Sequence, residues 1–192
     1  MELKKFIVLH PYLKTIAKFT GLPAFSHEVS EAYWLGNDQL KKAKLKDYNL
    51  LLENFALHGV PDFLIQELAS KKPRAFIPTH LFQVLHVGVG RASGSVPFNL
   101  ETINNCMIRW GKVKSLTASQ ATIDLHLLAK VKKGYKLVGS TISFPAAIKL
   151  VPNIKAGNTV AVHWKQLIKI LTEEEEKKLD YWTNEVMADF TA

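Results

Sequence analysis

The 192 residues include 47% hydrophobic and 22% charged residues, an ordinary globular composition that allows one medium domain or two small ones. The net charge of +8 is shared evenly between the two halves of the chain, so neither half is the basic arm of a nucleic-acid-binding protein. A single cysteine excludes an internal disulfide bond and any zinc site built from several thiolates.

Cellular location is indicated by the same cysteine count and by the N-terminus. One thiol fits a reducing cytoplasm. The first apolar run covers only about four residues, whereas a signal peptide needs more and a membrane span needs roughly 18. We therefore expect a cytoplasmic protein that makes no membrane contact.

The first half of the chain has the spacing and the breaks of short helices. Pro11 suits a first helical turn, and Gly21 ends that helix. Ser26 is a good N-cap for the next one. The residues Gly88, Gly90 and Gly94 fall in a loop-like stretch that we interpret as a linker. The predicted helices begin at Pro11 and cover 28–35, 48–57, 61–72, 79–87 and 98–104, and residues 1–97 form a helical domain.

Two kinds of polar residue in this half have open interpretations. Glu31 shares a helix face with Trp34, which indicates either a solvated acidic edge or a surface for a ligand or partner. His80 and His86 are six residues apart and do not share a helix face, so they cannot form a two-histidine metal site at the i, i+4 spacing. We expect both to be hydrogen-bonded packing residues.

From Cys106 onward the pattern changes to β-branched residues with a period of two. Five short strands separated by polar turns predict a small closed or partly open barrel of the OB-like kind, with any site on its rim. Thr172 and Glu175 form a capping box that begins a C-terminal helix. The fold class is thus α+β, with the barrel and helix in residues 98–192. The predicted strands are 106–113, 121–127, 135–138, 142–151 and 159–164.

Three segments in this half resemble the small hydrogenase maturation chaperones of the HypC/HupF type. Cys106, Gly111 and Val113 are similar to the start of that family, and 155–163 is similar to its late strand. The closing 170–176, Ile-Leu-Thr-Glu-Glu-Glu-Glu, is similar to the start of its last helix. The resemblance covers residues 105–185 and implies a HypC-like barrel.

The resemblance also implies a chemistry and partners. In that family a cysteine thiolate carries an iron that bears cyanide and carbonyl ligands, and a histidine on the late strand lies near it. The corresponding residues in this chain are Cys106 for the thiolate and His163 for its neighbour. The implied partners are a hydrogenase large subunit and maturation proteins. Arg109 or Lys112 is expected to lower the pKa of the thiol. Cys106 is internal, whereas the family's cysteine follows the initiator methionine, and Trp110 replaces a proline.

The whole chain further resembles a family found in hydrogenase gene neighbourhoods, for which no activity is assigned. That resemblance implies an association with hydrogenases and nothing about chemistry. The matching motifs are His10-Pro11-Tyr12-Leu13, the segment 31–37, the segment 78–82, the segment 106–111 and His163-Trp164.

We therefore expect a non-enzymatic accessory or maturation protein for a nickel–iron hydrogenase. The site residues are Cys106 and His163, and the accessory candidates are His80, Arg109, Trp110 and Glu31. The alternatives are a basic nucleic-acid-binding barrel, a structural protein with a buried Cys106, and a nucleophilic pair of Cys106 with His80 or His163. The dispersed lysines argue against nucleic acid. A thiol within roughly 4–5 Å of an imidazole in a solvent-reachable pocket would favour a site, whereas full burial of Cys106 among apolar residues would favour the structural protein.

Overall fold

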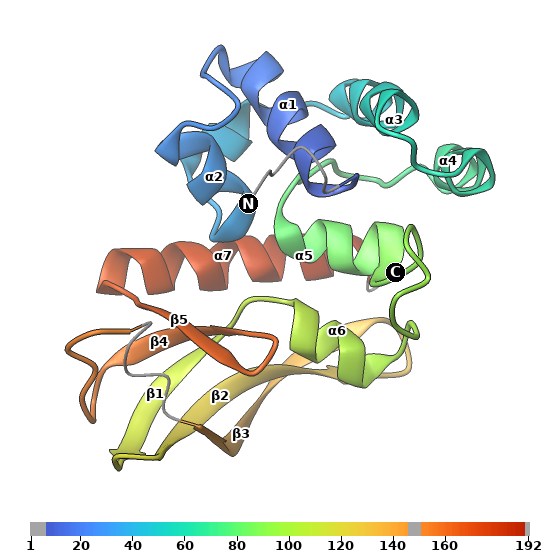
Figure 1. The fold of residues 1–192 in the computed structure, drawn as a ribbon. Helices are drawn as coiled ribbons and strands as arrows, with labels where there is room; N and C mark the ends of the chain where they lie inside the picture. The colour runs from blue at the N-terminus through green and yellow to red at the C-terminus, as the bar shows by residue number, and fades with distance from the viewer. Residues whose placement is uncertain (1–6, 146–150, 191–192) are drawn as a thin grey trace. The chain divides into compact units, whose positions relative to one another are not determined.

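The computed structural model describes residues 7–145 and 151–190. The chain divides into two compact units, Met1–Phe98 and Asn99–Ala192, which are described in turn (Figure 1). Among the described residues, no helix is both long enough and apolar enough to cross a membrane.

Unit 1 (Met1–Phe98) is built from short helices, and each predicted helix of this half is confirmed. Ser26 caps its helix as expected, because its side chain accepts a hydrogen bond from the Val29 amide at 3.3 Å. The region predicted as one helix over 79–87 begins as an α-helix and continues as a π-helix. The elements are α1 (Leu9–Thr20), α2 (His27–Trp34), η2 (Asp38–Lys42), α3 (Asp47–Leu57), α4 (Asp62–Ser70), α5 (His80–Phe82) and η3 (Gln83–Gly88).

The core of unit 1 is aromatic. Tyr12 of α1 packs against Tyr33 of α2 and Phe55 of α3, with ring centroids 5.6 and 5.8 Å apart. Tyr48 of α3 and Phe82 of α5 both pack edge-on against the ring of Phe76. All six rings are buried, so contacts between aromatic rings hold these short helices together.

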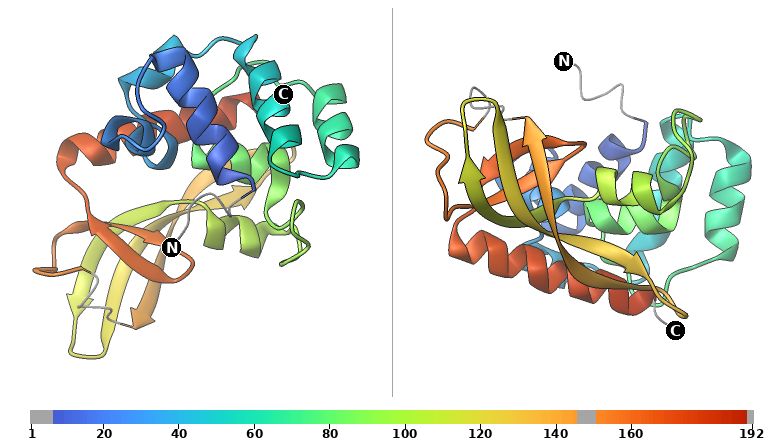
Figure 2. Two further views of the ribbon diagram at one scale, coloured as in Figure 1. Left: turned by 45° about the horizontal axis from the view of Figure 1, so that its top comes forward. Right: turned by 90° about the horizontal axis from the view of Figure 1, so that it is seen from below.

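Unit 2 (Asn99–Ala192) is a helix, a five-stranded antiparallel sheet and a C-terminal helix, so the α+β class is confirmed for the chain. The strand order is β3-β2-β1-β4-β5. The outer strands β3 and β5 do not pair with each other among the described residues, so the sheet is open and not a closed barrel (Figure 2). The elements are α6 (Leu100–Cys106), β1 (Arg109–Leu116), β2 (Gln120–Lys130), β3 (Tyr135–Pro145), β4 (Thr159–His163), β5 (Gln166–Ile170) and α7 (Glu173–Asp189).

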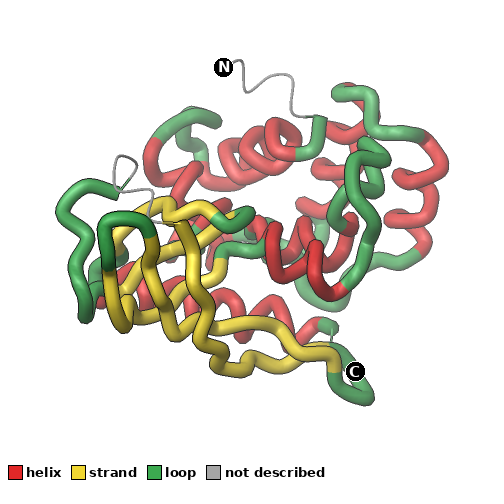
Figure 3. Tube along the Cα trace, turned by 60° about the horizontal axis from the view of Figure 1, so that its bottom comes forward, coloured by secondary structure: helices red, strands yellow, loops and turns green. Residues whose placement is uncertain are grey.

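Two predictions of local structure in unit 2 are wrong. Cys106 ends a helix instead of beginning a strand, because a capping box at Asn99 begins α6 and the Met107 amide still bonds the Ile103 carbonyl. The predicted strands 135–138 and 142–151 are one strand as far as Pro145, since Gly139 continues the pairing with β2 (Figure 3). Residues 146–150 lie outside the described residues. The fifth strand is β5, which follows a two-residue turn.

A mainly aliphatic core covers one face of this sheet. Gly111 lets the backbones of β1 and β2 lie close together. A Cβ atom built on Gly111 would lie 1.9 Å from the Asp124 carbonyl oxygen of β2. The glycine of the 106–113 motif is therefore required by strand packing. The core residues are Val113, Ala121, Ile123, Leu125, Phe144, Val151, Val160, Val162 and Leu167.

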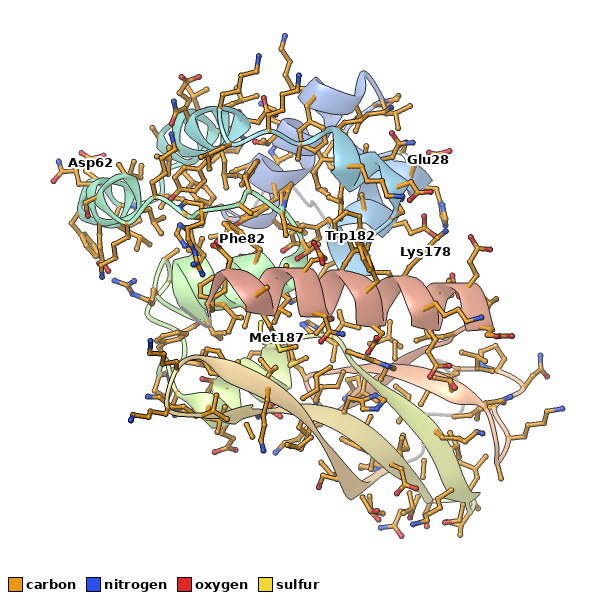
Figure 4. All side chains as sticks on the ribbon, turned by 180° about the vertical axis from the view of Figure 1, so that it is seen from behind. Glu28, Asp62, Phe82, Lys178, Trp182 and Met187 are labelled. Carbon is orange, nitrogen blue, oxygen red and sulfur yellow. The ribbon has the colours of Figure 1, made fainter. Side chains whose placement is uncertain are left out.

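The C-terminal helix α7 begins as the sequence predicts. Thr172 accepts from the Glu175 amide at 3.2 Å, and the Glu175 side chain accepts from the Thr172 amide at 2.9 Å. Its apolar residues recur at helical spacing, and among them Trp182 and Met187 (Figure 4) are buried. The acidic first turn complements the helix dipole and needs no catalytic role.

Candidate functional site

The two residues predicted as metal ligands lie side by side within unit 2. Cys106 is the last residue of α6, and His163 is the last residue of β4. The antiparallel pairing of Arg109 with Val162 brings the two chain segments together. The Trp164 amide then donates to the Asn105 carbonyl at 2.7 Å. As a result a ring nitrogen of His163 lies within 4.8 Å of the Cys106 sulfur.

His163 is held as a neutral imidazole. Burial is the larger cause, and the nearby charge of Arg109 adds to it, so that the pKa of His163 falls to about 4. One ring nitrogen bonds the Cys106 backbone carbonyl. That nitrogen must carry the proton, because a carbonyl only accepts, so the other nitrogen is the acceptor that a metal ion would use.

The thiol of Cys106 is neutral as well. Burial raises the pKa of Cys106 to about 11, and a hydrogen bond with Trp164 offsets only part of this rise. The expectation that Arg109 or Lys112 lowers the thiol pKa is therefore wrong. Lys112 is exposed, and the desolvation of the sulfur outweighs any nearby positive charge.

The turn that follows His163 is conformationally strained. Trp164 and Lys165 join β4 to β5 with φ angles of 47° and 62°, a left-handed backbone conformation that residues other than glycine rarely adopt. Strain of this kind persists where the surrounding structure fixes it, and it often marks functional sites. Here it fixes the end of β4 and therefore the position of the His163 ring. The sequence motif His163-Trp164 contains the first turn residue, but the sequence assigned it to the strand and did not reveal the turn.

Arg109 is buried, and no carboxylate of the described residues forms an ion pair with it. Only 3% of the residue is exposed, and its Nε and Nη2 atoms have no hydrogen-bond partner within the part of the chain that the structure describes. The guanidinium carbon lies 5.7 Å from the centre of the Phe144 ring. Burial lowers the pKa of Arg109 from its usual value. Arg109 also lines a cavity of about 430 Å³ together with Asn105 and Lys165, which the sequence did not reveal.

Trp110 lies in a separate hollow of unit 2. It is 1% exposed, and its ring centre is 4.9 Å from that of His126. Four residues of α7 complete a hollow of about 350 Å³ beside these two rings, namely Glu173, Glu176, Lys177 and Asp180. Trp110 is therefore a packing residue at the junction of the sheet with α7, and His126 was not singled out by the sequence.

The remaining candidates belong to unit 1 and have structural partners there. Glu31 accepts a hydrogen bond from the Asn37 amide group at 2.8 Å, which ties α2 to the start of η2. His80 is buried, and its Nδ1 lies 2.8 Å from the Tyr33 hydroxyl. His86 meets the Tyr48 hydroxyl at the same distance through Nε2. The hydrogen bonds predicted for His80 and His86 are thus present.

Comparison with known proteins assigns the chain to a family. Residues 2–191 match the model of a family of unknown function, DUF6390, and the chain belongs to that family. A search of curated proteins found no match, and a search of solved structures found none either. The family description gives no activity, so the function must be argued from the site.

Proposed function

We propose that the protein is an accessory or maturation protein for a nickel–iron hydrogenase and that it carries an iron centre as its cargo on Cys106, with His163 as neighbour. The observation that carries this proposal is the distance of at most 4.8 Å between the Cys106 sulfur and a His163 ring nitrogen. Thiolate and neutral imidazole are both suitable donors for low-spin iron. The resemblance of residues 105–185 to HypC/HupF-type chaperones supplies the identity of the cargo.

The protonation states set how such a cargo binds. Because the pKa of His163 is about 4, the imidazole is already in its ligand form at neutral pH. Because the pKa of Cys106 is about 11, the thiol must lose its proton when iron binds. Affinity should therefore rise about tenfold per pH unit between pH 6 and 9, with one proton released per iron. A half-buried, neutral thiol without metal is also oxidised less readily than an exposed thiolate.

The architecture of unit 2 supports a HypC-like assignment in outline. A helix-flanked antiparallel sheet with the order β3-β2-β1-β4-β5 is compatible with an opened OB-like barrel. The turn at 155–158, one of the resembling segments, fastens the end of β1, since the Gly157 amide donates to the Val113 carbonyl at 2.8 Å. We propose that residues 98–192 act as the chaperone-like domain that meets the partner proteins.

The same electrostatics argue against the nucleophilic alternative. A catalytic cysteine–histidine pair works as thiolate and imidazolium, which requires a low thiol pKa and a raised histidine pKa. Both shifts have the opposite sign here. A metal ligand pair is the chemistry that fits these two neutral groups.

The decisive experiment is infrared spectroscopy of the protein purified anaerobically together with hydrogenase maturation partners. Bands of iron-bound cyanide and carbonyl should appear in the wild type, vanish in Cys106→Ala and weaken in His163→Gln. The matched control is His126→Gln, which replaces a strand histidine on the far side of β1 from β4 and should keep the bands. The metal-carrier proposal fails if the wild type shows no bands or if Cys106→Ala leaves them unchanged.

The broader proposal needs its own test. A tagged wild-type chain should capture a hydrogenase large subunit or a maturation protein under anaerobic conditions. Cys106→Ala should capture the same protein if docking does not depend on the metal. Failure to capture any of these proteins would overturn the accessory role.

A further inference from the structure

We propose that the outer edge of β3 in unit 2 binds an extended, acidic segment of a partner protein, which pairs with this edge as an added antiparallel strand. The strand order β3-β2-β1-β4-β5 places β2 and β1 between this edge and His163 at the end of β4. The edge is therefore separate from the Cys106 and His163 pair, and the proposal stands whether or not the protein carries iron.

The first argument is the unpaired backbone of β3. Among the described residues β3 pairs with β2 alone, over all 11 of its residues (Figure 1). The Val131 amide donates to the Gly134 carbonyl at 3.1 Å, which closes the β2–β3 turn, and antiparallel bonding then alternates along the strand. Every second residue of β3 consequently directs its N–H and C=O groups away from β2. These outward residues are Tyr135, Leu137, Gly139, Thr141 and Ser143.

The second argument is that the middle of this edge is unprotected. Proteins usually shield an exposed edge strand by keeping it short or by placing charged residues or proline on it. The opposite edge strand β5 has five residues and carries Lys169, whose ammonium group pairs with Glu175. In β3, residues 137–144 include no charged residue and no proline. A long edge of this kind suits the addition of a strand from a partner.

The third argument is that the outward residues in the middle of β3 are accessible. Gly139, Thr141 and Ser143 are exposed. A Cβ atom built on Gly139 would meet no atom within 4 Å. A strand added at the usual spacing of about 4.8 Å can therefore place its own side chains beside Gly139 without a clash.

The fourth argument is charge, which identifies the chemistry of the partner. Eight lysines and no acidic residue lie between Asp124 and Glu173. Four of these lysines surround the β2–β3 turn, where all are exposed and none forms an ion pair with a described residue, namely Lys130, Lys132, Lys133 and Lys136. Carboxylates of a partner segment would complement this group of charges.

Other occupants satisfy only one of these features. A second copy of the chain would pair its own β3, which lies in the same acid-free segment, so neither β3 strand would bring a carboxylate to the lysines. Nucleic acid would neutralise the lysines, but it lacks the peptide groups that pair with a strand edge. In antiparallel pairing the C-terminal end of the added segment lies beside the β2–β3 turn, so its carboxylates belong at that end.

The test is amide hydrogen exchange of the full chain, followed by NMR, with a designed probe peptide. The probe alternates valine and threonine over seven residues and ends in three glutamates. Saturating probe should slow the exchange of the outward amides of Leu137, Gly139 and Thr141 roughly tenfold or more, while the Val138 amide, which faces β2, changes little. A probe with glutamine in place of glutamate should bind roughly tenfold more weakly. Moving the glutamates to the N-terminal end should also weaken binding.

Variants separate the charge from the backbone pairing. Lys132→Gln combined with Lys133→Gln should weaken probe binding roughly fivefold. Lys41→Gln combined with Lys42→Gln, the same change at two adjacent exposed lysines of unit 1, should bind like the wild type. Gly139→Pro removes an outward donor and no bond to β2, so it should abolish the protection, whereas Gly139→Ala should keep it. If Gly139→Pro does not fold, exchange in the wild type decides alone.

Several results would overturn the proposal. These are no binding of the probe, binding without protection of the outward amides, equal binding of the glutamate and glutamine probes, and tighter binding of a single-stranded oligothymidylate of the same charge. Protection of the same amides without probe, increasing with protein concentration, would replace the acidic segment by a second copy of the chain.

Discussion

The two units bury polar side chains in different ways. In unit 1 the histidines His80 and His86 each meet a tyrosine hydroxyl at 2.8 Å, within an aromatic core. In unit 2 the core is aliphatic, and the buried polar groups gather outside it, at the end of α6 and the β4–β5 turn. There the Arg109 donors Nε and Nη2 have no acceptor among residues 7–145 and 151–190.

This difference indicates where binding chemistry is located. Side chains that satisfy one another stabilise a fold and leave little capacity for a ligand. Among the described residues the Tyr12 hydroxyl of unit 1 also lacks a partner, but unit 2 combines a thiol, a neutral imidazole and an unsatisfied guanidinium. These groups are costly for folding alone and make unit 2 the better candidate for binding. The predictions below test each half of this contrast.

The largest effect on stability is expected from Gly111→Ala, which disturbs the sheet that supports the site in unit 2. The added Cβ would meet the Asp124 carbonyl oxygen at 1.9 Å, and a backbone atom in a paired strand cannot move aside cheaply. We expect a loss of about 3 kcal/mol or more in the free energy of unfolding, measured by urea denaturation. Gly139→Ala in β3 is the matched control, because no atom lies within 4 Å of its Cβ position. Equal stabilities of the two variants would contradict the close-approach argument.

The second effect is a loss of stability in mild acid that depends on His163. Its pKa is about 4 in the folded protein and near 6.5 when unfolded, so the unfolded state binds the proton first. The contribution of the neutral His163 side chain to the free energy of unfolding is therefore complete above about pH 6.5. It decreases as the pH falls toward 4, by at most about 3 kcal/mol. Urea denaturation between pH 7 and 4 should show a smaller loss for His163→Gln than for wild type.

The control for this pH dependence is His126→Gln, which should retain the wild-type loss. The difference between the losses of stability of the two variants is the informative quantity. Parallel pH profiles for the two variants would show that His163 is not held neutral by its surroundings.

The third effect tests the hydrogen-bonded network of unit 1. The Tyr48 hydroxyl donates to the Leu68 carbonyl at 2.9 Å and meets His86 Nε2. Tyr48→Phe should therefore cost about 2 kcal/mol in the free energy of unfolding. Tyr12 is equally buried, but among the described residues its hydroxyl has no partner. Tyr12→Phe should be neutral or stabilising, and a similar cost for both variants would show that the hydroxyl contacts do not matter.

The sequence predicted what local signals control. Ser26 and Thr172 mark helix starts, and both caps are present. Predictions from the sequence were wrong where contacts between distant segments determine the structure. Cys106 was assigned to a strand because the residues after it alternate, although the cap at Asn99 carries the helix through it. Whether five strands close depends on pairing between residues far apart in the chain, and periodicity does not encode that pairing.

The candidate site shows the same limit. The closeness of Cys106 and His163 follows from the pairing of β1 with β4, which family resemblance suggested and no spacing rule contains. Arg109 looked like a charge that tunes a nearby thiol, since arginine in a strand is usually exposed. Its burial and the cavity beside it arise from the packing of Phe144 and the α6 residues, which only three-dimensional structure reveals.

The smallest effect separates a purely local stabilisation from the chemistry of unit 2. Thr172→Ala removes the hydroxyl that accepts from the Glu175 amide, and it should lower the free energy of unfolding by about 1 kcal/mol. Thr172→Ser keeps the cap and should remain within a few tenths of wild type. Because the cap begins α7 and contains none of the proposed iron ligands, Thr172→Ala should show the same infrared bands as the wild type once the protein is folded. If weakened capping also weakened these bands, the iron site would depend on α7 and could not be a property of Cys106 and His163 alone.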